Sequence, residues 1–510
     1  MTDIKESHRE LFQRWLANIK PDRGDIGLHT YDLVRVAHPD YHVTRATADR
    51  VNLLGYAEAG HAKAVPEHND PRVASTIRTY QSSAGPFQRQ KGELGDVVQF
   101  GRWSYTWSST TFIVYYITAA EPNSDPSTFM FVLAPIKPGD ENEVHHPQTD
   151  ALLLEAGIWT SSLHDEIYVW DDNGWVKDAP LFKSIKSASW DDIILPPSVK
   201  TSLISDTLGF FDSREVYQSL ALSWKRGIIL HGVPGNGKTA TIKALINSLA
   251  EKDIPSLYVK QFDSCRGSKW SIKRIFERAR QMAPCLLIFE DLDSLVEDKL
   301  RSYFLNEVDG LESNEGILMI GSTNHLSRLD PAIAKRPSRF DRKYHFAIPD
   351  LETREEYAKY WRRKLEGKEA GKGFEEGLCP LVAKLTEGFS FAYMRELFVS
   401  TLLAIIRGQV GDVEEAGAGE DSASGKDVVI VEGPPKDGDE EGKKRVFPTV
   451  ETPEEFADNV YFKVLKVQAK ILFDQMEDAE EKPKVPRPPG MMPAGFMMPT
   501  MMASQIARKK

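Results

Sequence analysis

The sequence is poor in cysteine, with three in 510 residues. Cys265, Cys285 and Cys379 lie far apart, and no two of them have the CxxC spacing typical of a zinc site. A disulfide framework is not indicated either, because such frameworks depend on several closely spaced cysteines. We therefore expect a protein of a reducing compartment inside the cell, the cytoplasm or the nucleus.

Long apolar runs and an excess of basic residues are also missing. The longest strongly apolar run, TFIVYYITAA at 111–120, has about half of the roughly 20 residues that a membrane-spanning helix needs. The acidic residues Asp3, Glu6 and Glu10 argue against a signal or transit peptide. The net charge of −11 does not favour a nucleic-acid partner, which would require a basic footprint. We expect a soluble protein without membrane insertion.

The chain is long enough for two or three domains, and residues 1–185 are predicted to form the first, an N-terminal α+β domain that binds an unknown client or partner. Apolar runs at 111–120 and 129–136 flank a turn-rich segment and predict a hairpin, and 166–177 repeats the signal around Asn173-Gly174. Six of the ten tryptophans fall in this region. They are predicted to belong to a core, with an aromatic binding surface as the alternative.

Residues 186–350 alternate short apolar runs with helical stretches, which predicts an α/β domain with a parallel sheet covered on both faces. The expected strands lie near 228–231, 256–260, 286–290, 316–322 and 344–347. The expected helices lie near 238–250, 271–282 and 299–308.

Residues 351–480 are predicted to form a helical domain, with the amphipathic segment 389–408 as its clearest helix. It is interrupted at 411–445 by an acidic insert rich in Gly, Ser and Pro, which is predicted to be disordered. A last helix is predicted from Thr452, as the cap, to about 478. The Pro/Met-rich segment 481–510 is predicted to be a flexible arm.

The strongest motif is GVPGNGKT at 232–239, which matches the phosphate-binding pattern GxxxxGKT. It lies between an apolar run and a helical segment, so that glycine backbone N–H groups and a helix N-terminus can surround phosphates. Lys238 is predicted to reach the β- and γ-phosphates of ATP, and Thr239 to bind Mg²⁺. The predicted contacts are Gly232, Val233, Pro234, Gly235, Asn236, Gly237, Lys238, Thr239 and Ala240.

A second motif follows about fifty residues later, where LLIFEDLDSL at 286–295 runs from apolar residues into Glu290, Asp291 and Asp293. This pattern is typical of a buried strand that ends in carboxylates. A metal-binding carboxylate next to a general base can polarise a water opposite the γ-phosphate. The residues alone leave open which acid does which.

A third segment, GSTNHLSRLDPAIAKRPSRFDRKYHFAIPD at 321–350, closely resembles the second region of homology of the AAA family of ATPases. The resemblance implies that Asn324 is the polar sensor that positions the attacking water. It implies that Arg336 and Arg339 are arginine fingers that reach the γ-phosphate of a neighbouring subunit. The family's glycine is Ser338 here and the preceding spacing is one residue longer, so Arg339 matches more directly than Arg336. The alternative is that both arginines pair with surface acids.

The resemblance covers roughly residues 190–408. WDDIIL at 190–195 resembles the segment beside the adenine, which implies nucleotide contacts at Asp192 and Ile193, and EGFSFAYMREL at 387–397 implies one at Ala392. The family forms rings, so the resemblance also implies self-association, as a homo-hexamer, with the helical region as a lid over the nucleotide.

Most AAA proteins have Asp then Glu where this chain has Glu290 then Asp291. The reversed order resembles a subgroup typified by the chaperone that assembles mitochondrial respiratory complex III, and by soluble fungal AAA proteins. The resemblance assigns Glu290 to the Mg²⁺ shell and Asp291 to the water, although Asp291 is also counted as a metal contact. Strand alternation leaves a rival in which Asp291 serves the metal, with Asp293 on the same face.

These observations predict an ATP-hydrolysing ring that remodels or chaperones a protein client. The loop QFDSCRGSKW at 261–270 keeps only Gly267 of the family's pore motif, which speaks against threading of an unfolded polypeptide. The alternative is a weakly hydrolysing, nucleotide-dependent scaffold or assembly switch. A small-molecule P-loop kinase would leave Asn324 and the two downstream arginines unexplained.

Overall fold

The computed structural model describes residues 10–11, 26–67, 75–81, 92–119, 127–136, 144–172, 174–309, 313–334, 336, 339–408 and 446–480. The chain divides into two compact units, Met1–His164 and Asp165–Lys510. The expected insert at 411–445 and arm at 481–510 lie outside the described residues. Among the described helices, none has both the length and the apolar content required to cross a bilayer.

The N-terminal unit contains an antiparallel sheet in the order β1-β6-β5-β4-β2, with β3 paired to β4. The register of β5 against β6, with Tyr115 opposite Phe131, confirms the hairpin predicted from the two apolar runs. The strands are β1 (Tyr41–Thr47), β2 (Lys63–Pro66), β3 (Ser75–Gln81), β4 (Glu93–Trp107), β5 (Thr110–Ala119) and β6 (Ser127–Pro135).

Helices cover both faces of this sheet. The helix α2 (Ile26–Ala37) packs through Val34 onto one face, and α3 (Leu53–Glu58) and α4 (Pro147–Ser161) pack onto the other. Successive residues of β5 therefore enter two cores, Tyr115 the first and Val114 the second. This burial on both faces explains why the run at 111–120 is apolar without alternation.

The second unit is built on a mostly parallel sheet in the order β13-β9-β12-β11-β10-β7-β8. Its strands β9 to β13 are the five that the apolar runs predict, so the predicted α/β class is confirmed. The strands are β7 (Ile167–Asp171), β8 (Gly174–Asp178), β9 (Lys225–Gly232), β10 (Ser256–Val259), β11 (Cys285–Phe289), β12 (Ile317–Thr323) and β13 (Arg342–Phe346).

The hairpin β7–β8 corrects the expected boundary at residue 185. It was predicted in the N-terminal domain, but β7 pairs in parallel with β10, with Tyr168 opposite Leu257, and so extends the second sheet. Its Trp170 is 1% exposed and lies beside Trp175 and Trp270. The turn signal predicts a hairpin from local residues only, and the sheet it joins depends on this distant tryptophan contact.

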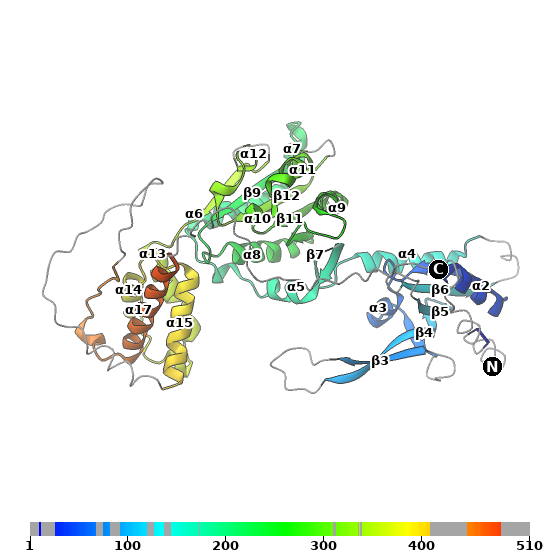
Figure 1. The fold of residues 1–510 in the computed structure, drawn as a ribbon, viewed down its shortest axis with the longest axis horizontal. Helices are drawn as coiled ribbons and strands as arrows, with labels where there is room; N and C mark the ends of the chain where they lie inside the picture. Colours follow the sequence, from blue (N-terminus) through cyan, green and yellow to red (C-terminus); the bar gives the residue numbers. More distant parts are fainter. Residues whose placement is uncertain are drawn as a thin grey trace, which may run out of the picture. The chain divides into compact units, whose positions relative to one another are not determined.

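Two helical layers enclose the parallel sheet (Figure 1). On one face, α5 (Ala179–Lys186), α6 (Pro197–Asp212) and α8 (Lys238–Ala250) share a core with alternate strand residues. On the other face, α9 (Ser268–Gln281) and α11 (Asp298–Asp309) bring Phe276 and Phe304 against Phe289 of β11, with ring centroids 5.4 to 6.1 Å apart. The shorter helices are α7 (Arg214–Ser219), α10 (Leu292–Leu295) and α12 (Pro331–Ala334).

The helices of the C-terminal part lie side by side around a core of their own (Figure 1). They are α13 (Leu351–Leu365), α14 (Leu378–Leu385), α15 (Phe391–Ile406) and α17 (Val460–Glu480). The last helix begins later than predicted, because Glu454–Phe456 forms a single 3₁₀ turn. Asn459 rather than Thr452 caps α17, with its Oδ1 accepting a hydrogen bond from Phe462 N at 3.0 Å.

Candidate nucleotide-binding site

The glycine-rich segment forms a tight loop between the end of β9 and the start of α8. Gly232, Gly235 and Gly237 have φ angles of +142°, +84° and +91°, which side chains rarely tolerate. A Cβ on Gly232 would lie 2.2 Å from the carbonyl oxygen of Phe346, and one on Gly235 would lie 2.6 Å from Cβ of Ala392. Gly237 is the N-cap of α8 and offers no side chain to it, so the helix N-terminus can serve an anion.

A cavity of about 700 Å³ opens beside this loop. It brings together most of the residues that the sequence singles out, although they come from five separate segments. Gly232, Val233, Arg336 and Arg339 are not among its lining residues. The predicted residues in its wall are Asp192, Ile193, Pro234, Gly235, Asn236, Gly237, Lys238, Thr239, Ala240, Glu290, Asp291, Asn324 and Ala392.

Lys238 lies at the first turn of α8 with its ammonium inside the loop. Its Nζ donates to the carbonyl oxygens of Gly232 and Val233 at 2.7 and 3.0 Å. Burial lowers the pKa of Lys238, while the nearby carboxylates of Asp291 and Asp293 oppose that shift. The ammonium is thus poorly solvated and held by two neutral carbonyls, an arrangement that a phosphate oxygen can improve.

Asp291 turns away from the line of β11. Its φ of +48° is left-handed and makes it the N-cap of α10, and its backbone N–H donates to Ser322 Oγ at 3.2 Å. Asn324, which follows β12, donates from Nδ2 to Asp291 Oδ1 at 3.4 Å. The strand ends at Phe289, so strand alternation does not extend to Asp293, whose carboxylate accepts from Thr323 Oγ1 at 2.7 Å.

Glu290 lies between Tyr258 and the cavity. Its Oε2 accepts a short hydrogen bond from the Tyr258 hydroxyl, and its Oε1 is buried without a hydrogen-bond partner among the described residues. Burial, followed by the hydrogen bond to Glu290, raises the pKa of Tyr258, which therefore stays protonated as the donor. A buried carboxylate oxygen without a partner is suited to a cation.

Residues of the C-terminal helices α13 and α15 line the cavity and contact the glycine loop. Asn236 donates from Nδ2 to Ala347 O at 3.0 Å and accepts from Phe391 N at 3.3 Å, and Ala392 N donates to Gly235 O at 3.0 Å. The sequence reasoning identified Ala392 but missed further lining residues. Those from α13 and α15 are Tyr357, Phe391, Arg395, Glu396 and Val399. Helical spacing from position 392 was a signal for the last three, because residues three, four and seven positions apart share a face.

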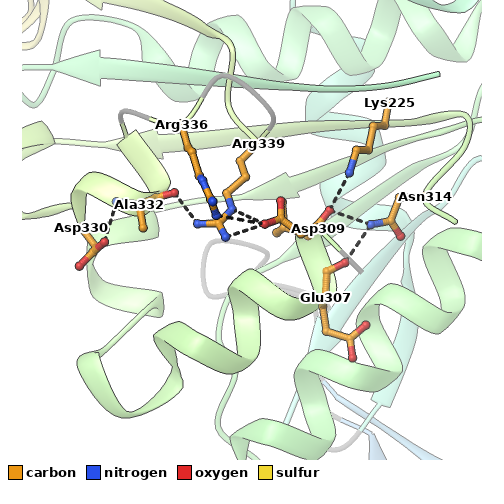
Figure 2. Close-up of polar contacts among 9 residues, drawn as sticks. Lys225, Glu307, Asp309, Asn314, Asp330, Ala332, Arg336 and Arg339 are labelled. Atoms are coloured by element: carbon orange, nitrogen blue, oxygen red, sulfur yellow. Dashed lines mark hydrogen bonds and ion pairs between the residues drawn. The ribbon is translucent and has the colours of Figure 1, made fainter. Parts of the chain in front are cut away.

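The two arginines lie away from the cavity of their own chain. Arg339 is 7% exposed, and it donates from Nε and Nη2 to Asp309 Oδ2 at 2.8 and 2.5 Å and from Nη1 to Ala332 O at 2.6 Å (Figure 2). Arg336 is 63% exposed and approaches the same Asp309 oxygen only to 3.8 Å. Arg339 therefore has an acidic partner in its own chain, as the alternative reading expected.

The fold and the glycine loop define the class of P-loop nucleotide-binding domains. Residues 228–348 match the family described as ATPase family associated with various cellular activities (AAA). They are therefore an AAA domain, which confirms the family resemblance read from the motifs. The subgroup with the reversed acids stays a prediction.

Curated relatives agree with this assignment. The chain is 31% identical over 227 residues to the ATPase family gene 2 protein of Saccharomyces cerevisiae, which covers 42% of this chain and 28% of that protein. It is 29% identical over 210 residues to the ATPase histone chaperone abo1 of Schizosaccharomyces pombe, which covers 38% of this chain and 17% of that protein. It is 30% identical over 210 residues to the human ATPase family AAA domain-containing protein 2, which covers 38% of this chain and 15% of that protein. The likeness thus spans less than a third of each relative.

Proposed function

We propose that this protein binds and hydrolyses ATP. The observation that carries the proposal is the pairing of Asp291 with Asn324 in the cavity that the glycine loop and Lys238 also line. A carboxylate beside an amide can accept a proton from a water while the amide orients it. The same cavity places the loop N–H groups and an ammonium where the transferred phosphate carries its charge.

The residues divide the work as follows. Lys238 exchanges its two carbonyl partners for phosphate oxygens. Thr239 and Glu290 would hold Mg²⁺, and the buried Oε1 of Glu290, which has no hydrogen-bond partner among the described residues, supports this assignment. Asp291 is the base rather than a metal ligand, because it faces Asn324 and because Tyr258 holds Glu290 apart from it. Bound Mg²⁺ would neutralise the charge on the phosphates.

The nucleotide base takes the other end of the cavity. Asp192 and Ile193 line it next to α13, and the Tyr360 hydroxyl donates to Asp192 Oδ1 at 2.7 Å. Ala392 adds a lid contact. Because Ala392 N also bonds to Gly235 O, movement of the lid is coupled to the phosphate loop.

At the level of assembly, we place the protein in a homo-oligomeric ring, a hexamer, that acts on a protein client in the cytoplasm or the nucleus. The exposed Arg336 supports a ring, since it lines no cavity of its own chain's nucleotide site. A matched relative is named a histone chaperone, which supports a protein client. The N-terminal unit is the candidate client-binding part.

The loop 261–270 supports remodelling without threading. Phe262, one of two aromatic residues at the loop, is 3% exposed and packs against Phe289 and Phe304. Trp270, the other, packs against Trp170. Both aromatic side chains are engaged within their own subunit, so neither is offered to a polypeptide in a pore.

A nucleotide-dependent scaffold with weak turnover is the second candidate. The observation in its favour is Asp291, which is one methylene shorter than glutamate and so reaches less far towards a water. ATP hydrolysis by the assembled wild type separates the two, because a scaffold would bind ATP with little or no steady-state turnover.

The experiment measures phosphate release against Mg²⁺ concentration for the wild type and Glu290→Gln, with the oligomer confirmed by light scattering. We expect wild-type turnover that depends on Mg²⁺. Glu290→Gln should need about tenfold more Mg²⁺, at least, to reach half of its maximal turnover. The exposed acid Asp298 provides a matched control as Asp298→Asn, which should leave the curve unchanged. ATP binding without turnover in the assembled wild type would overturn the proposal.

A further inference from the structure

The two arginines three positions apart both approach Asp309, but Arg339 is buried and hydrogen-bonded to it, whereas Arg336 is 63% exposed and lies beyond hydrogen-bond distance. The sequence does not show this difference. Resting on the proposed ATPase function, we propose that Arg336 alone is the cation offered to the neighbouring subunit, while Arg339 is a positioning residue that Asp309 holds within its own chain. The resemblance at the level of motifs favours Arg339 as the more direct match, and the structure reverses that order.

Arg339 uses every nitrogen of its guanidinium inside the subunit. Nε and Nη2 converge on Asp309 Oδ2, and Nη1 reaches the carbonyl of Ala332 in α12 (Figure 2). The Arg339 side chain is 7% exposed and that of Asp309 is 35% exposed, so the arginine end of these charge-assisted hydrogen bonds is shielded from water. To serve a neighbour, Arg339 would have to break all three and leave Asp309 without its cation.

Asp309 has a physical need for this partner. It is the last residue of α11, where the helix dipole disfavours a carboxylate, and the last turn of α11 contains no basic residue. The hydrogen bond from Arg339 lowers the pKa of Asp309, with smaller contributions from Lys225 and Arg336. Asp309 therefore joins the end of α11 to the arginine segment as a charged pair.

The backbone at Arg339 is fixed as well. A Cβ on Gly227 of β9 would lie 2.0 Å from the Arg339 carbonyl oxygen, so only glycine allows this approach. Two residues on, Asp341 N donates to Gly227 O at 3.0 Å. The arginine segment is thereby attached to β9, α11 and α12 at once.

Arg336 approaches the same carboxylate, but its side chain is mostly exposed (Figure 2). Arg339 N donates to Arg336 O at 3.2 Å, which ties the backbone of Arg336 to that of the buried Arg339. The Arg336 guanidinium is 63% exposed, and the distance of 3.8 Å from Nη1 to Asp309 Oδ2 is that of an ion pair without a hydrogen bond. An exposed cation whose backbone is anchored can be placed against a neighbour's phosphate at little conformational cost.

The test compares Arg336→Ala, Arg339→Ala, Asp309→Asn and the double variant of the last two, by ATP turnover of the assembled protein and by thermal unfolding. We expect Arg336→Ala to lose about 10³-fold in turnover with an unchanged melting temperature. Arg339→Ala and Asp309→Asn should both lower the melting temperature, and they should lower ATP turnover to a similar degree. Both substitutions break the same Asp309–Arg339 pair. The melting temperature of the double variant should therefore be no lower than that of the less stable single variant. Arg328→Ala, an exposed arginine on the preceding segment, is the matched control and should match the wild type.

Asp309→Asn distinguishes the two possible roles of Arg339. Either Asp309 holds it as a positioning residue, here called the clamp, or it is the cation given to the neighbouring subunit. If Arg339 were the cation given to the neighbour, releasing it from Asp309 would keep or raise turnover, while Arg339→Ala would lose as much as Arg336→Ala. That pattern would overturn the proposal, as would additive losses of melting temperature in the double variant. A wild-type assembly that binds ATP without turnover would instead overturn the proposed ATPase and with it the role of Arg336. Non-additive melting temperatures would then still show the Asp309–Arg339 clamp.

Discussion

Asn324 Nδ2 lies 3.4 Å from Asp291 Oδ1, although the two residues are 33 positions apart. The contact exists because β11 and β12 are parallel neighbours, with Phe289 opposite Gly321, so that the residues after each strand emerge at one edge of the sheet. A left-handed turn at Asp291 then directs its carboxylate to the amide instead of along the strand. This relationship gives the chain an acid and an orienting amide beside the phosphate loop.

Lys238→Ala is expected to weaken ATP binding by about 10- to 100-fold, because a charge-assisted hydrogen bond to phosphate is lost. Isothermal titration or a fluorescent ATP analogue measures the affinity. Lys243→Ala is the matched control, since Lys243 lies on the same helix with its Nζ 3.3 Å from Ser184 Oγ. Equal affinities for the two variants would contradict the role of Lys238.

Gly235→Ala is expected to lower ATP affinity by about tenfold, because the new methyl group meets Ala392 and strains a backbone with φ of +84°. The control Gly367→Ala has a φ of +73° and no heavy atom near the added Cβ. It should lose some stability but keep its ATP affinity. If both variants bind ATP as the wild type does, the close packing of loop and lid is not needed for binding.

Mixing inactive subunits tests whether the arginine acts across an interface. Arg336→Ala keeps its own Asp291 and Asn324, while Asp291→Asn keeps Arg336, so mixed rings contain complete sites where the two meet. We expect each variant alone to be nearly inactive and the co-assembled mixture to regain turnover. Phosphate release before and after subunit exchange measures it. Activity that stays at the level of the separate variants would show that Arg336 does not act in trans.

The N-terminal unit should lose stability on mild acidification. His38 Nε2 lies 2.9 Å from the Tyr115 hydroxyl oxygen, and burial, aided by the charge of Arg102, lowers the pKa of His38 to about 4. An unfolded histidine takes up its proton near pH 6.5, so between 6.5 and 4 the unfolded chain binds more protons and folding weakens as the pH falls. Calorimetry of the full chain should show this slope in the wild type and a smaller one in His38→Gln. An identical slope in the variant would assign it to another group.

The local signals of the sequence predicted the parts of the fold that depend on neighbouring residues. The strands β9 to β13 correspond to apolar runs of the sequence. The glycine loop depends on positive φ angles, which glycine adopts without strain and which its motif therefore predicts. The hairpin β7–β8 was placed in the wrong domain because its packing depends on Trp270, about a hundred residues away. The start of α17 was also wrong, because a 3₁₀ turn replaced the predicted cap.

The candidate site shows the same division. Motifs predicted the residues that line the cavity, from Pro234 to Ala240 and at Asn324, because each belongs to a contiguous pattern. They did not predict the partner of Arg339, because Asp309 is 30 positions away and belongs to no motif. They also missed Tyr258, whose hydroxyl holds Glu290 and which is recognised only through the pairing of β10 with β11.

The central claim, that this AAA domain hydrolyses ATP with Asp291 as the base, is tested most directly by ATP turnover and ATP affinity of Asp291→Asn in the assembled protein. Asparagine keeps the size of the side chain and removes the ability to accept a proton. We predict wild-type turnover, a loss of about 10²- to 10⁴-fold in the variant, and ATP binding that is kept. Turnover that survives in Asp291→Asn, with Glu290→Gln inactive in its place, would contradict the account.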